Sequence, residues 1–171
     1  MGDALPTLDR FALAVAHLPG AVDGGRAGDA WYDVTAIADG HLAIVGGAHR
    51  RSRRGNRAAG QRRPSPPLVR RAAQVAPVLA PGTLLGVYAD IELTEVTVRL
   101  EHGDMMVLYT DGVTEARGVD GFYGGQRLTR VVRSSPASAD AVADNLLGDV
   151  IAFQQHRLRD DVAVLVVEAT P

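Results

Sequence analysis

The sequence contains no cysteine and no lysine, and only 5% of its residues are aromatic. Without cysteine there is no disulfide, no thiolate nucleophile and no cysteine-ligated zinc or iron–sulfur site. The uncharged apolar runs are far shorter than the ~18 residues that a membrane span requires. The N-terminus also lacks a basic segment followed by an apolar one, the pattern of an export signal. These absences predict a globular protein of the cytoplasm with no membrane partner.

Length and composition indicate one folded unit. The chain has 171 residues, of which 46% are hydrophobic and 22% are charged. A chain of this size buries roughly two thirds of its unfolded surface, and this composition is not that of a disordered protein. We therefore expect residues 1–171 to form a single domain.

The basic residues are concentrated in one block. The net charge is -2, and all 18 basic residues are arginine. Seven of them lie between His49 and Arg63: Arg50, Arg51, Arg53, Arg54, Arg57, Arg62 and Arg63. This arginine block fits a solvated loop, a surface that grips an acidic protein or a phosphate, or a patch that binds nucleic acid. It has no aromatic residues for base stacking, which argues against nucleic acid as the partner.

The first half of the chain has the pattern of strands. Apolar residues alternate with small ones from Phe11 to Pro19, which predicts a strand with one buried face. Asp39-Gly40 separates the apolar runs 30–38 and 41–45, and Asp-Gly favours the positive φ angles of a tight hairpin turn. We therefore predict a β-hairpin around Asp39-Gly40.

The second half of the chain combines strands with helices. Alternation over 96–100, a turn at 102–104 and a continuous apolar run over 105–110 predict a second hairpin whose later strand is central in its sheet. Leucine and valine at helical spacing predict a short helix over 126–133.

The C-terminal part is predicted to be a helix followed by a buried strand. Ser135 and Pro136 suit the N-cap and first position of a helix that continues to about Gln155. Residues 161–168 then form a strongly apolar run. Strands and helices are segregated along the chain, which favours the α+β class with a largely antiparallel sheet.

Aspartates occur next to the ends of several predicted strands. They are Asp29, Asp33, Asp111, Asp160 and Asp161. Carboxylates that converge from strand ends form oxygen-rich sites for hard cations such as magnesium or manganese. The same residues also suit turns and helix ends, so the pattern alone leaves both interpretations open.

Several motifs in order along the chain resemble one enzyme family. Residues 103–117 read GDMMVLYTDGVTEAR, which resembles the long signature of the bacterial metal-dependent (PPM-type) protein serine/threonine phosphatases of the SpoIIE and RsbU branch. Further segments resemble that family at residues 29–33, 39–45, 84–87, 124–128 and 159–165. In the first of these, one additional residue separates the two aspartates.

The resemblance implies a fold, a cofactor and a partner. The implied fold is a two-layer antiparallel β-sandwich flanked by helices (α/β/β/α), with a two-metal Mn²⁺ or Mg²⁺ site at the sheet ends. Family members hydrolyse phosphoserine or phosphothreonine, typically on STAS-type anti-anti-sigma proteins. By position, Asp111 and Asp160 correspond to direct metal ligands, and Asp29 to a residue that holds metal-bound water or a more distant contact. Asp33 matches less well because of the shifted spacing.

One motif position departs from the family. The resembling hairpin ends in GDVxGHG, whose aspartate bridges both metals, whereas this chain has Gly47 at that position. Without a bridging anion, two dications in a partly dry site repel each other. Coulomb's law gives a cost on the order of several kcal/mol. We expect the two-metal site not to assemble, leaving one ion or none. A rearranged one-metal site that includes His49, Asp111 and Asp160 is an alternative.

The centre of the chain is shorter than in the family. Residues 57–63 resemble the start of the family's long helix, and residues 64–70 resemble a strand motif, GHPPLLVR, that normally follows much later. Part of the central region is therefore missing near residues 63–66. Because the missing elements ordinarily cover a sheet, we expect exposed apolar surface and association into a homodimer.

Three hypotheses follow for the function. The first is a degenerate phosphatase domain with weak or no activity that acts in sigma-factor signalling. The second is an active Mn²⁺- or Mg²⁺-dependent phosphoserine phosphatase. The third is a nucleic-acid-binding module that uses the arginine block.

Overall fold

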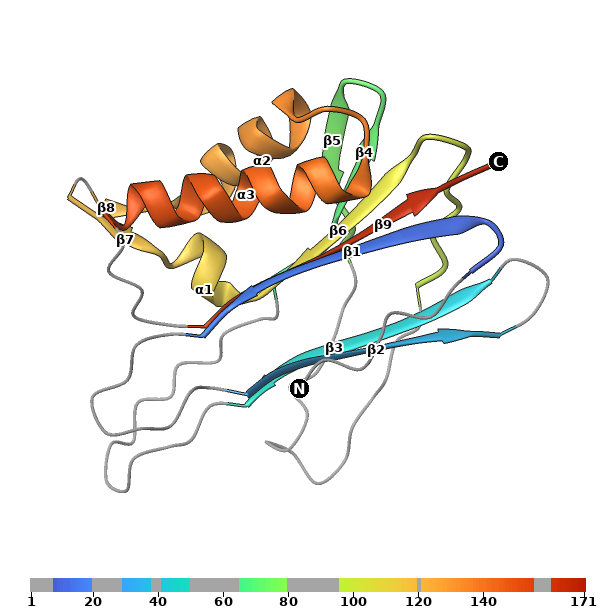
Figure 1. Cartoon of the computed structure of the whole chain (residues 1–171), viewed down its shortest axis with the longest axis horizontal. Helices are drawn as coiled ribbons and strands as arrows, with labels where there is room; N and C mark the ends of the chain where they lie inside the picture. Colours follow the sequence, from blue (N-terminus) through green and yellow to red (C-terminus); the bar gives the residue numbers. More distant parts are fainter. Residues whose placement is uncertain are drawn as a thin grey trace.

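The main structural unit is a five-stranded antiparallel sheet. The computed structural model describes residues 8–19, 29–37, 41–49, 65–79, 96–119, 121–155 and 161–171. From one edge to the other, the strands are β1 (Phe11–Leu18), β9 (Val162–Ala169), β6 (Met105–Tyr109), β4 (Leu68–Arg71) and β5 (Gln74–Pro77). Figure 1 shows helices on one face of this sheet and a two-stranded sheet on the other. This arrangement confirms the predicted α+β class with antiparallel pairing.

β9 joins the first strand of the chain to β6. It pairs along its whole length with β1, from Phe11↔Ala169 to Leu18↔Val162, and its other edge pairs with β6. Its valines fill the core, and Val162 and Val166 are fully buried. The predicted first, central and last strands are therefore confirmed.

The predicted hairpin over 96–110 is wrong in its first arm. Residues 96–100 form no strand, because β6 already pairs with β4 on one edge and with β9 on the other. The turn that precedes β6 is confirmed: the Asp104 amide donates to the Glu101 carbonyl at 2.8 Å, and Gly103 has a φ of +83°. The alternation in this segment therefore does not reflect strand pairing.

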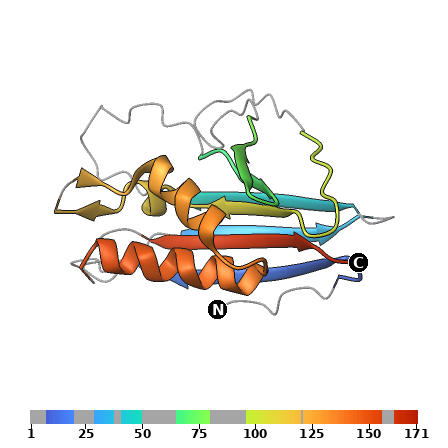
Figure 2. The same ribbon diagram turned by 90° about the horizontal axis from the view of Figure 1, so that it is seen from above.

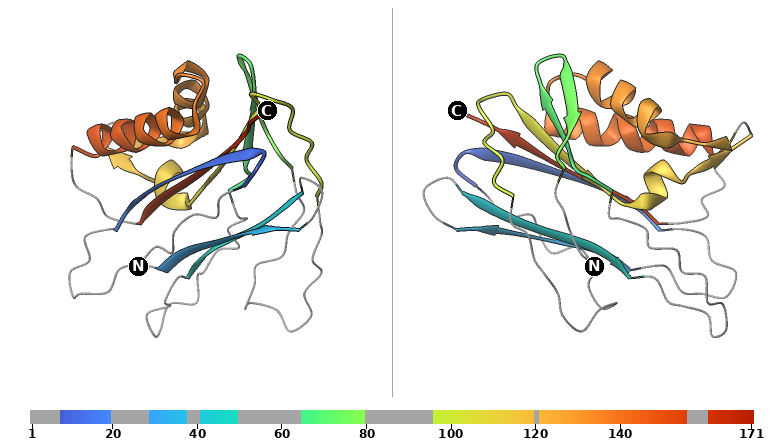
Figure 3. Two further views of the ribbon diagram at one scale, coloured as in Figure 1. Left: turned by 45° about the vertical axis from the view of Figure 1, so that its right-hand side comes forward. Right: turned by 180° about the vertical axis from the view of Figure 1, so that it is seen from behind.

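The hairpin around Asp39-Gly40 is confirmed in its two arms. β2 (Asp29–Ala36) pairs antiparallel with β3 (Leu42–His49), so β3 continues past the predicted limit at Val45. The views in Figure 3 show this two-stranded sheet opposite the helices. The helix predicted over 57–63 and the arginine block lie outside the described residues.

Two helices cover the five-stranded sheet. α3 (Ala139–Phe153) lies over β1 and β9, and α2 (Gly124–Ser134) lies over β4 and β5 (Figure 2). The apolar positions that predicted these helices face the core; the fully buried ones are Leu128, Val132, Val142, Leu146 and Val150. No helix in the described part of the chain is long and apolar enough to cross a membrane.

The N-cap of α3 is not the predicted Ser135. Ser135 ends α2 instead: its amide and its hydroxyl both donate to the Val131 carbonyl, at 3.0 and 2.8 Å. The cap is Ser138, whose hydroxyl accepts from the Ala141 amide at 3.1 Å. Ser135, which the local sequence predicts at the start of α3, thus lies at the end of α2.

Candidate functional site

Asp111 lies where β6 ends and α1 (Asp111–Thr114) begins. Because β6 and β9 are antiparallel, the end of β6 lies beside the start of β9. The Thr110 amide extends this pairing by donating to the Ala163 carbonyl at 3.0 Å. The structure therefore brings the segment of Asp111 next to that of Asp161, which directly precedes β9.

Thr110 and Gly112 hold these two segments together. The Thr110 hydroxyl donates to the Asp161 carbonyl at 3.0 Å and accepts from the Ala163 amide at 3.0 Å. Gly112 lies so close that a Cβ there would be 2.9 Å from the Asp161 carbonyl carbon and would collide with its oxygen. The residues on either side of Asp111 therefore fix its backbone against Asp161, a role that the sequence analysis missed.

The two aspartates differ in exposure. Asp111 is half-buried, and no described residue donates a hydrogen bond to its carboxylate. Asp161 is only 7% exposed. The Asp111 carbonyl accepts from the Glu115 amide at 2.7 Å, which closes the single turn of α1. The Asp111 carboxylate is thus left for solvent or for a cation.

The β2–β3 hairpin brings three other predicted positions into register. Asp29 pairs with His49, and Trp31 pairs with Gly47. Figures 1 and 3 show the start of β2 and the end of β3 at the same end of the molecule as α1 and the start of β9. Asp33 lies further along β2, opposite Val45. Asp160 lies outside the described residues.

Within the described residues, the candidate site has two aspartates on adjoining segments and no larger group of possible ligands. Carboxylate oxygens suit Mg²⁺ and Mn²⁺, and Asp111 and Asp161 lie on adjoining segments. However, the described residues contain no group of three or more His, Asp or Glu side chains that could hold a metal ion. Position 47 on β3 adds no side chain because it is glycine.

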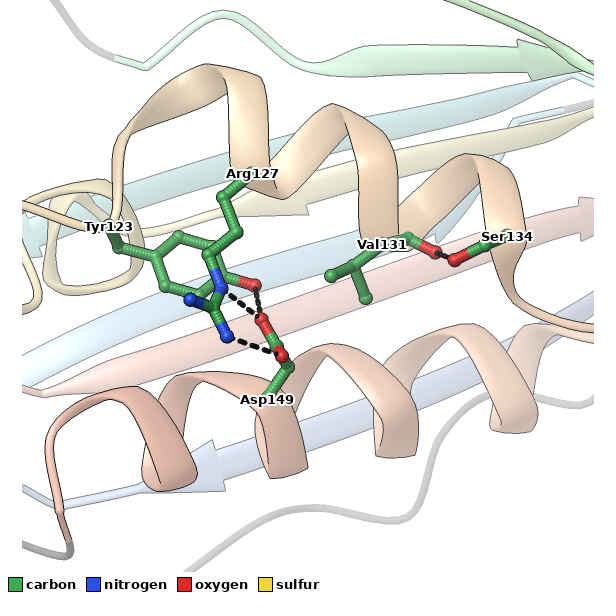
Figure 4. Close-up of polar contacts among 5 residues, drawn as sticks. All are labelled: Tyr123, Arg127, Val131, Ser134 and Asp149. Atoms are coloured by element: carbon green, nitrogen blue, oxygen red, sulfur yellow. Dashed lines mark hydrogen bonds and ion pairs between the residues drawn. The ribbon is translucent and has the colours of Figure 1, made fainter.

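A second carboxylate, Asp149 on α3, has the opposite environment (Figure 4). Arg127 of α2 donates from Nε and Nη2 to its two oxygens at 2.7 and 2.8 Å, and the Tyr123 hydroxyl donates at 2.6 Å. The hydrogen bonds from Arg127 lower the pKa of Asp149 below its ordinary value. Burial, reinforced by the negative charge of Asp149, raises the pKa of Tyr123. The sequence analysis missed this cluster because Asp149 lies 22 residues after Arg127, on a different helix.

Aromatic contacts extend this cluster to the segment that follows α1. The Arg127 guanidinium lies over the rings of Tyr123 and Phe153, 5.3 and 4.8 Å from their centres, and the two rings meet edge to face. Gly118, in the short hairpin of β7 (Arg117–Gly118) and β8 (Gly121–Phe122), is in close contact with Phe153. The chain that leaves α1 is thereby anchored to the end of α3.

Comparisons with known proteins agree with this fold and these motifs. The model of the Stage II sporulation protein E (SpoIIE) family matches residues 58–170. Over 89 residues the chain is 33% identical to the phosphoserine phosphatase RsbU of Bacillus subtilis, a match that covers 52% of this chain and 27% of RsbU. The chain thus spans about a quarter of that relative's length.

Solved structures show the same fold at low identity. The phosphatase domain of Bacillus subtilis SpoIIE, in a crystal form without domain swapping, superposes with a TM-score of 0.64 at 16% identity and covers 94% of this chain and 93% of that one. The same domain from a crystal presoaked with manganese gives 0.52 at 16% identity, over 100% and 94%. The RsbU and RsbW domains of a Mycobacterium tuberculosis protein give 0.62 at 20% identity, over 94% and 60%. This chain belongs to the SpoIIE family of PP2C-type phosphatase domains, which is related to RsbU.

Proposed function

We propose that this SpoIIE-family domain is a degenerate member, with weak or no phosphatase activity, that acts as a binding domain in sigma-factor signalling. The observation that carries the proposal is Gly47. It occupies the position on β3 where the family motif has the aspartate that bridges two cations. A glycine offers no anion, so two dications there would repel each other by several kcal/mol, as an order-of-magnitude estimate.

We further propose that the remaining ligands hold at most one Mn²⁺ or Mg²⁺ ion. They are Asp111, Asp160 and Asp29, by their match to the family motifs. When bound, such an ion polarises a phosphoryl oxygen and lowers the pKa of its bound water. The protein's own contribution is to fix the Asp111 backbone through Thr110 and Gly112 and to leave its carboxylate without a described hydrogen-bond donor.

The proposed partner is a phosphorylated STAS-type anti-anti-sigma protein. The identity to a phosphoserine phosphatase, RsbU, supports this class of partner. We also propose that residues 1–171 form one two-layer sandwich domain that is shortened near residues 63–66. Only residues 50–67 separate β3 from β4, which leaves little chain for further elements. A homodimer would cover sheet surface that the shortening exposes.

Residual activity is tested with Asp111→Asn. Hydrolysis of p-nitrophenyl phosphate and of a phosphoserine STAS protein would be measured with manganese for the wild-type protein and for this variant. We expect the same background rate for both. A manganese-dependent rate that the variant loses would show instead that the domain is an active phosphatase.

The role of position 47 is tested by restoring the carboxylate. We expect Gly47→Asp to bind manganese more tightly in a calorimetric titration. Gly46→Asp is the matched control, because neighbouring residues on a strand face opposite sides and the added charge is the same. Equal gains for both variants would mean that position 47 is not the missing bridge.

A further inference from the structure

A groove of about 570 Å³ opens between the β4–β5 hairpin and α2. The exposed Pro66 and Pro77 line it together with the half-buried Tyr109, and the buried Leu68 and Leu128 form its floor. Arg130 and Arg133, one turn apart on α2 and both exposed, line it as well. The groove thus combines apolar side chains with positive charge, in a volume typical of sites that take a few side chains.

Neither arginine forms an ion pair in the described part of the chain, although the charge of Arg130 helps to lower the pKa of Asp149. Among the described lining residues there is no carboxylate, and α2 carries no acidic residue. No described carboxylate lies within ion-pair distance of Arg130 or Arg133. Arg127, on the same helix, is different because Asp149 binds its guanidinium. The helix dipole favours a cation in the last turn of α2, which explains the positive charge at Arg133. It does not explain why an apolar groove lies beside that charge.

We propose that this groove binds an acidic segment of a partner protein. Carboxylates of the segment pair with Arg130 and Arg133, and one of its apolar side chains packs against Pro66 and Pro77, the exposed apolar residues of the lining. A protein segment fits better than a nucleic acid, since base stacking uses exposed aromatic rings and Tyr109, the one aromatic residue among the described lining residues, is half-buried. The inference goes beyond the proposed function because this binding requires neither a metal nor a phosphate.

The charge contribution is tested with a fluorescein-labelled peptide in which Glu-Asp pairs alternate with leucine. Its binding would be followed by fluorescence anisotropy at low and physiological salt. We expect the double variant R130E/R133E to bind about tenfold more weakly or worse. The control R10E/R99E makes the same change in net charge at two other exposed arginines and should bind as the wild type does.

The apolar contribution is tested with the same peptide carrying serine in place of leucine, which should bind more weakly. Methyl resonances in NMR give an independent readout: the leucine peptide should shift Leu68, at the floor of the groove, and leave Leu146, a fully buried residue of α3, unchanged. Equal binding by both double variants, or no binding at about 1 mM peptide, would overturn the proposal. Tighter binding of a thymidine oligonucleotide, lost in R130E/R133E, would assign the groove to nucleic acid instead.

Discussion

Asp111 and Asp149 belong to the same domain but have opposite chemical surroundings. Asp149 accepts three hydrogen bonds, two from Arg127 and one from Tyr123, and its charge is balanced by the guanidinium. Asp111 follows a core strand, and no described residue donates to its carboxylate. A balanced carboxylate contributes to stability, whereas an unbalanced one at a strand end is available to a cation.

The two regions also differ in what fixes them. Side chains hold the Asp149 cluster, through an ion pair and the rings of Tyr123 and Phe153. Backbone contacts hold the Asp111 segment, through the close approach of Gly112 to Asp161. Substitutions should therefore separate the two regions. Around Asp111, stability should depend on the backbone contacts and not on the carboxylate. Around Asp149, it should depend on the carboxylate.

The largest effect is expected from Gly112→Ala. The added methyl group overlaps the Asp161 carbonyl, which is backbone and cannot rotate away. We expect the free energy of unfolding, measured by urea denaturation, to fall by about 3 kcal/mol. Gly148→Ala is the control, since a Cβ there meets nothing within 4 Å and alanine favours the helix by about 0.5–1 kcal/mol. A similar result for both variants would contradict the close approach at Gly112.

A smaller loss is expected from Arg127→Ala. The substitution leaves Asp149 without its ion-pair partner and removes the stacking on Phe153. The two side chains are 34% and 29% exposed, so we expect about 2 kcal/mol rather than the larger cost of a fully buried pair. Arg130→Ala, one turn later on α2, should change stability by less than about 0.5 kcal/mol. Equal losses would mean that the pair with Asp149 adds nothing.

The pH dependence of stability should depend on Asp149. Its folded pKa lies below the unfolded value of about 3.9, so its contribution is present above that pH and is lost as the pH falls through the folded pKa. We expect the wild type to be about 1–2 kcal/mol more stable than Asp149→Asn at pH 7, and this difference to shrink below about pH 4. Urea midpoints across this pH range would measure it. A constant difference would show that the charge of Asp149 plays no part.

The smallest effect on stability is expected from Asp111→Asn. Because no described residue donates to its carboxylate, removal of the charge should change the free energy of unfolding by less than about 0.5 kcal/mol. Urea denaturation beside Asp149→Asn makes the comparison direct. A loss as large as that of Asp149→Asn would reveal a structural partner for Asp111 and remove the contrast between the two carboxylates.

Much of the fold was predictable because the signals are local. The apolar run of β6, the Asp-Gly turn before β3 and the helical spacing over α2 and α3 each predict the element that is observed. Residues 96–100 have an equally clear alternation but no strand, because both edges of β6 are occupied by strands from distant parts of the chain. Alternation indicates an extended segment with one buried face. It does not show whether a neighbouring strand has an unpaired edge for that segment.

The candidate site was predictable only in part. The motif around Asp111 pointed to this position, and the pairing of β6 with β9 explains why it lies near Asp161. The roles of Thr110 and Gly112 depend on contacts with residues of β9 and its approach, which no local pattern contains. The ligand roles of Asp29 and Asp160 stay predictions.

The position of β9 between β1 and β6 has a consequence for how the chain folds on the ribosome. Of the strands that the structure describes, β1 emerges first, yet its partner in the sheet, β9, emerges last. Until β9 leaves the exit tunnel, β1 has no strand beside it and one edge of β6 stays open, so such a chain exposes surfaces that favour aggregation. Completion of this sheet therefore waits for β9, and its long-range pairing favours slow folding.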